Sequence, residues 1–178
     1  ILTPIIIFSL EILEKNNKKK LSEEFNNLLI NKKNLKKDLL KSELVKIVES
    51  KNDTYSPLAL YYLLDEDLID DEKEINELFD ILIYKTDLKD EFTELLILKK
   101  AIFNSNFEDD QKFFSIIQPL INSKSIWKSQ ALYLAGEYYL SKNEMIKSKE
   151  FFEEILTLEN SSSNLISEVK VRLSRDFK

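Results

Sequence analysis

The densest group of side chains that could do chemistry is an acidic run in the first half of the chain. Its carboxylates come from residues 65–67, residues 70–72 and Glu74, and calcium-binding loops use carboxylates in this way. Such loops also need a Gly at the sixth place and a Glu at the twelfth, but the run lacks both; Ile69 takes its fifth place and Asn76 its twelfth. Negative charge at the start of a helix is stabilising, and we expect that role here.

The sequence lacks several residue types on which many enzymes depend. The 178 residues include no His, no Cys and a single Gly. This excludes His-based acid–base chemistry, Ser-His-Asp and Cys-His nucleophiles, the usual zinc sites and glycine-rich nucleotide loops. Carboxylate pairs at helical spacing, such as Glu150 and Glu154, are expected by chance when 33% of the residues are charged. We therefore predict a protein that is not an enzyme, with no catalytic residue, metal, cofactor or small-molecule substrate.

The charge balance argues against a nucleic-acid partner. Asp and Glu number 32 against 26 Lys and Arg, which gives a net charge of -6. Nucleic-acid binders are usually basic, with the basic residues on one face. Only Arg172 and Arg175 could supply the bidentate contacts of a guanidinium. The Lys residues alternate with acidic ones, as on solvated helix faces.

Every segment from Lys20 onward can be interpreted as helix, and no run shows sustained strand alternation. Ser56 before Pro57 is a good N-cap, and Asp71 with Glu74 has capping-box spacing. Pro119 should end or kink its helix. We predict an all-α fold of about nine helices, near residues 21–32 (or from the apolar start), 35–50, 57–64, 71–85, 87–104, 106–118, 126–141, 144–158 and 165–175.

The segment 129–162 resembles a single 34-residue tetratricopeptide repeat. The only Gly of the chain falls where that repeat brings two helices close together, and aromatic side chains could fill the space beside the contact. The residues that we expect to make this repeat packing are Leu132, Ala135, Gly136, Tyr139, Ser148 and Phe152. We predict a tetratricopeptide-like right-handed solenoid of antiparallel helix pairs, because helices of this length need stacking to stay folded.

Four aromatic residues could line a groove for a partner protein: Tyr61, Tyr62, Trp127 and Tyr138. The inner surface of a solenoid commonly binds peptides in this way. The alternative is that these side chains pack between helices. Neither interpretation identifies the partner.

The chain begins with an apolar run, residues 1–13, which a Lys-rich segment follows abruptly. A membrane-spanning helix needs ~20 apolar residues, so the run is too short by itself. We interpret residues 1–13 as the end of a truncated N-terminal membrane anchor and residues 14–178 as the helical domain. The alternatives are the apolar part of a signal peptide and a first helix that packs on the domain.

This layout is similar to that of bacterial, inner-membrane-anchored tetratricopeptide-like proteins related to YfgM, the ancillary subunit of the Sec translocon. The resemblance lies in the apolar start, the Lys-rich junction, the helix start 56–60, the segment 127–132, Phe151-Phe152 and the final helix 170–175. It implies a single-pass protein of the bacterial inner membrane. The helical domain would lie in the periplasm and contact the translocon, chaperones and client chains.

We therefore expect a noncatalytic protein–protein interaction module of the cell envelope that assists the Sec translocon and the periplasmic chaperone network. The Lys residues after the apolar run favour the cytoplasmic side, which is the alternative for the membrane topology. The alternative function is a soluble cytoplasmic adaptor or scaffold with the same fold.

Overall fold

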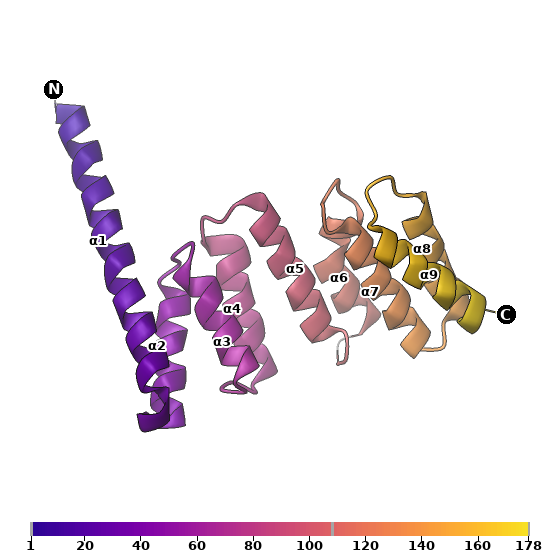
Figure 1. The fold of residues 1–178 in the computed structure, drawn as a ribbon, viewed down its shortest axis with the longest axis horizontal. Helices are drawn as coiled ribbons and strands as arrows, with labels where there is room; N and C mark the ends of the chain where they lie inside the picture. The colour runs from indigo at the N-terminus through magenta and orange to yellow at the C-terminus, as the bar shows by residue number, and fades with distance from the viewer. Residues whose placement is uncertain (1, 108, 178) are drawn as a thin grey trace. The chain divides into compact units, whose positions relative to one another are not determined.

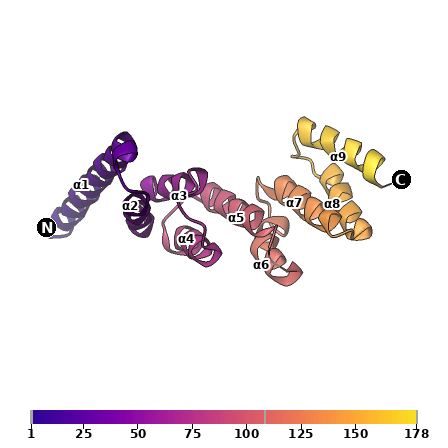
Figure 2. The same cartoon turned by 90° about the horizontal axis from the view of Figure 1, so that it is seen from below.

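The computed structural model describes the backbone of residues 2–107 and 109–177, and the side chains of residues 15–107 and 109–177. Within these ranges the chain forms nine α-helices and one 3₁₀ turn, without a strand. Figures 1 and 2 label the helices in chain order. The prediction of an all-α fold with about nine helices is confirmed. The helices divide into two compact units, residues 1–88 and 89–178.

The first unit contains four helices and the 3₁₀ turn: α1 Leu2–Asn31, η1 Lys32–Asn34, α2 Lys37–Glu49, α3 Tyr55–Asp65 and α4 Glu72–Lys85. The helices α2, α3 and α4 pack against one another, and Leu44, Leu60 and Leu82 are fully buried. The second half of α1 is attached to this group through aromatic and charged side chains. Phe25 contacts Tyr55 of α3, with 5.9 Å between the ring centroids.

The second unit contains five helices: α5 Asp90–Asn104, α6 Asp110–Ile121, α7 Lys128–Ser141, α8 Met145–Thr157 and α9 Ser163–Asp176. Each helix packs on the next along the chain, so its apolar stripe is covered by its neighbours in sequence. One core cluster joins α5, α6 and α7 around Phe113 and Ile117. A second joins α7, α8 and α9 around Leu132, Phe152 and Val169.

The expected N-cap at Asp71 is confirmed, and Asp109 caps a second helix in the same way. The Asp71 carboxylate accepts a hydrogen bond from the Glu74 backbone N–H at 2.8 Å, and α4 begins directly after it. The Asp109 carboxylate accepts one from the Lys112 N–H at 2.9 Å at the start of α6. Both satisfy an N–H group that has no partner within the helix. The acidic run of residues 65–74 thus contributes a helix cap.

The predicted N-cap at Ser56 is wrong. Ser56 does not cap α3, because the helix already begins at Tyr55; its hydroxyl is buried and donates to the Ile47 carbonyl at 2.6 Å. Pro119 does not end α6, which continues to Ile121. A proline at this place removes the hydrogen bond from residue 119 to the carbonyl of Ser115, and the helix still continues for two more residues.

The expected position in the membrane is corrected. The helix α1 continues without a break through Lys15 and residues 18–20, so its apolar stretch is short. No helix within the described residues combines the length and the apolar character that a membrane crossing requires. This finding contradicts a single-pass inner-membrane protein with a periplasmic domain. Ile1 of the expected anchor lies outside the described residues, and the expected boundary after residue 13 falls inside α1.

Candidate functional site

The helices α7 and α8 meet at the only glycine of the chain. A Cβ atom on Gly136 would lie 2.7 Å from Cε1 of Phe152, which is too close for any side chain without a shift. The Ser148 hydroxyl donates to the Gly136 carbonyl at 2.8 Å, and this hydroxyl is fully buried. A small residue on each helix therefore permits the approach, and the Phe152 ring fills the space beside it.

The other expected repeat-packing residues are buried as well, Leu132 in the cluster of Phe152 and Tyr139 in the cluster of Phe113. Leu132 and Ala135 are fully buried, and Tyr139 is nearly so. The Tyr139 ring stacks on Phe151 of α8, with centroids 5.8 Å apart and planes 14° from parallel. The structure thus buries all six residues that the repeat pattern singled out.

The four expected groove aromatics occupy different environments. Tyr61 and Tyr62 lie half-buried on α3 in the first unit, and Trp127 lies half-buried before α7 in the second. The Trp127 indole N–H donates to the Glu91 carbonyl at 3.0 Å. Tyr138 is only 3% exposed and stacks on Phe113, with centroids 4.0 Å apart. Its ring therefore packs between helices, whereas the other three keep an accessible edge.

A charged group holds the start of α6 to the end of α7. The Lys142 ammonium lies 2.7 Å from the Asp110 carboxylate and 4.3 Å from the centroid of the Tyr138 ring. The hydrogen bond from Lys142 lowers the pKa of Asp110, and the same bond raises the pKa of Lys142. Burial raises the pKa of Tyr138. Paired opposite charges of this kind link the two helices.

A second charged group links α9 to α7. The Arg172 guanidinium contacts the Glu137 carboxylate at 2.7 Å and the Asp176 carboxylate at 3.2 Å. Asp176 also accepts a hydrogen bond from Arg175 at 2.6 Å, and these bonds lower its pKa to about 2. Both Arg residues of the chain are therefore engaged within α9 and its contact with α7. Among the described residues, no group of three or more acidic side chains is placed to hold a metal ion.

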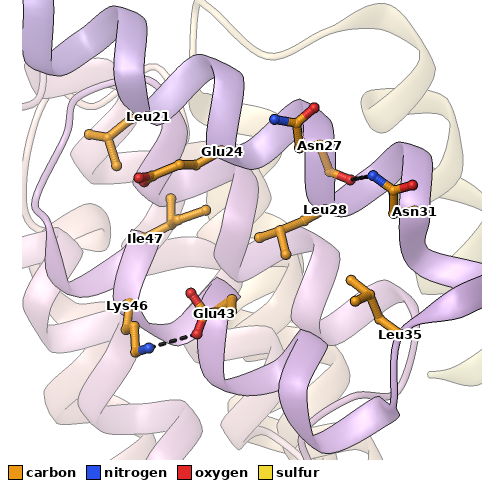
Figure 3. A pocket seen from close by; sticks show the side chains of 9 residues that line it. All are labelled: Leu21, Glu24, Asn27, Leu28, Asn31, Leu35, Glu43, Lys46 and Ile47. Carbon is orange, nitrogen blue, oxygen red and sulfur yellow. Dashed lines mark hydrogen bonds and ion pairs between the residues drawn. The ribbon is translucent and has the colours of Figure 1, made fainter.

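A hollow in the first unit lies between α1 and α2 (Figure 3), and sequence reasoning missed it. We call it the α1–α2 groove; its volume is about 540 Å³. Its lining residues come from α1, the turn after it and α2: Leu21, Glu24, Asn27, Leu28, Asn31, Leu35, Glu43, Lys46 and Ile47. The signal in the sequence was the seven-residue spacing of Leu21, Leu28 and Leu35.

Another hollow, with a volume of about 630 Å³, lies in the second unit, between the loop before α7 and the loop after α8. It is lined mostly by polar side chains such as Ser123, Lys124 and Asn160. Ile126, which is 65% exposed, lies at the same place.

Comparisons of the chain with protein-family models, with curated proteins and with solved structures find no match. The resemblance to the YfgM-related family therefore stays a prediction.

Proposed function

We propose that this protein is a noncatalytic adaptor or scaffold, a tetratricopeptide-like stack of antiparallel helix pairs that binds other proteins. The observation that carries the proposal is the contact of Gly136 with Phe152, reinforced by the hydrogen bond of Ser148. A tetratricopeptide repeat pairs its two helices through small residues in this way. Stacks of such pairs are binding surfaces in many proteins.

The order of packing supports a repeat-like arrangement. In the second unit each helix packs on its sequence neighbour, and the connection from α7 to α8 is only three residues long. A short connection makes neighbouring helices antiparallel. In α9 Val169 is buried, whereas Glu168 and Lys170 are exposed, so this helix packs through one apolar face.

The side-chain chemistry supports a binding role over an enzymatic one. The charged groups around Asp110 and Arg172 pair with each other across helix contacts. Apolar side chains, in contrast, remain at the surface: Phe92 and Ile126 are more than half exposed. The export function implied by the YfgM-like resemblance depended on a membrane anchor and a periplasmic domain, and it is not part of this proposal.

Site-specific photocrosslinking in cells tests the proposal. Benzoylphenylalanine replaces Tyr61 or Trp127, both half-buried aromatic residues, in the full-length protein. A third variant carries it in place of Glu150, which is exposed on α8. We expect discrete adducts of defined mass from at least one aromatic position and none from position 150. If the folded variants form no adducts, or the same adducts from all three positions, the adaptor proposal is wrong.

A further inference from the structure

We infer that the α1–α2 groove binds an amphipathic helix of a partner protein, with aliphatic side chains toward the groove and a Lys or Arg paired with Glu24. The inference rests on the proposed adaptor function and adds the site and the chemistry of the partner. It follows from the shape of the groove, from its apolar floor and from the charge of the side chains that line it.

The apolar floor of the groove has the spacing of a helix-binding surface. Leu21 and Leu28 lie on α1, Leu35 lies near the turn after it, and all three are half-buried. Across from them Ile47 of α2 is only 3% exposed (Figure 3). From Leu21 to Asn31 the α1 wall extends for ~15 Å, or about three helical turns. A partner helix of that length would present apolar side chains at i, i+3 or i+4, and i+7.

The charged side chains that line the groove carry an excess of negative charge. Two of them, Glu24 and Glu43, are acidic, and only Lys46 is basic. Lys46 lies 2.6 Å from the Glu43 carboxylate, whereas Lys20, which lies 3.6 Å from Glu24, does not line the groove. Both pairs are exposed and contribute little to stability. The lining therefore offers the Glu24 carboxylate beside an apolar floor, and a cationic residue of the partner complements it.

A second copy of this chain fits less well. A symmetric pair of copies would meet through the same surface on both sides. Each copy would bring the same lining, in which Glu24 and Glu43 outnumber Lys46, so the excess of negative charge would be doubled and not neutralised. A separate protein with a basic, amphipathic helix avoids this repulsion.

The test is a selection of helical peptides, displayed on phage with random side chains, against the full chain. We expect the enriched peptides to share aliphatic residues seven positions apart and a Lys or Arg beside them. Leu28→Asp should weaken their binding about tenfold or more, which corresponds to the loss of ~1.4 kcal/mol. A second variant, Glu24→Lys, changes a half-exposed side chain and should weaken binding severalfold. This variant decides the test if the protein with Leu28→Asp does not fold.

Two matched controls lie on the same helix. Ile30 is 76% exposed and is not part of the groove, so Ile30→Asp should leave binding unchanged. Glu23 pairs with Lys19 at the same spacing as Glu24 with Lys20, but it does not line the groove. Glu23→Lys should therefore also have no effect.

Three results would overturn the inference. One is enrichment of no peptide, or of acidic peptides. Another is binding that Leu28→Asp and Glu24→Lys leave intact. The third is concentration-dependent dimerisation in sedimentation that both variants abolish, which would make a second copy the occupant. If any of these occurs while photocrosslinks from position 127 persist, the groove assignment fails and the adaptor function stands.

Discussion

The Phe152 ring lies against the backbone of Gly136, with its Cε1 atom 2.7 Å from the place where a Cβ would stand. The contact joins α7 and α8, and the Ser148 hydroxyl donates a buried hydrogen bond across it to the Gly136 carbonyl. Any side chain larger than hydrogen must push the ring aside. The stability of the second unit should therefore depend on this position more than on an ordinary helical glycine.

Gly136→Ala is expected to destabilise the protein despite the better helix propensity of Ala. The propensity gain is about 1 kcal/mol, whereas overpacking of a core costs about 1–3 kcal/mol. We expect a net loss of about 1 kcal/mol, or ~2–4 °C in Tm, measured by circular dichroism. In a Phe152→Leu background the same change should be neutral or stabilising, because the ring is gone. Equal effects in both backgrounds would show that the two residues are not coupled.

Two buried hydroxyls should contribute unequally to stability. Ser148→Ala removes one hydrogen bond and should cost about 1 kcal/mol. Ser56 donates to the Ile47 carbonyl and also accepts from the Asn52 N–H at 2.8 Å. Ser56→Ala leaves that N–H without its partner, so we expect a larger loss of about 1–3 kcal/mol. Urea unfolding measures both.

The matched control for these serines is Ser42. Its hydroxyl bonds the Leu39 carbonyl at 2.9 Å in an exposed position, where water can replace the bond. Ser42→Ala should change the free energy of unfolding by less than about 0.5 kcal/mol. If Ser56→Ala is as mild as Ser42→Ala, the buried role assigned to Ser56 is wrong.

The stability of the protein should fall in acid partly through Asp176. Its pKa in the folded protein is about 2, below the ordinary value of 3.8, because Arg175 and Arg172 donate to its carboxylate. A lowered pKa means that this contribution is complete above about pH 4 and is lost as the pH falls toward 2. Asp176→Asn should therefore be less stable than the wild type at pH 6, with the difference shrinking by pH 2 in thermal melts. A difference that stays constant over this range would contradict the assignment.

The sequence predicts the number and type of the helices well, because capping and apolar periodicity are local. The caps at Asp71 and Asp109 and the pairing of Gly136 with Phe152 all depend on residues close in the chain. Ser56 was misassigned because its partner, the Ile47 carbonyl, belongs to another helix. Tertiary contacts of this kind leave no local pattern.

The α1–α2 groove could not be predicted, although its leucine spacing is visible. The seven-residue spacing of its leucines is equally compatible with a helix face that a neighbouring helix covers completely. The hollow exists because α1 and α2 do not close over these leucines. The boundary between the two units also could not be predicted from the residue types around it. The connection around Leu88 contains no Gly or Pro that would indicate a linker.

The most direct test of the account is the NMR signal of Gly136. Because the chain contains one glycine, a sample labelled with ¹⁵N,¹³C-glycine gives a single backbone resonance. We predict that the Phe152 ring shifts the Hα protons of Gly136 upfield and that these protons show nuclear Overhauser contacts to the ring. A glycine signal near its random-coil position, with no contact to an aromatic ring, would contradict the helix pairing on which the proposed function rests.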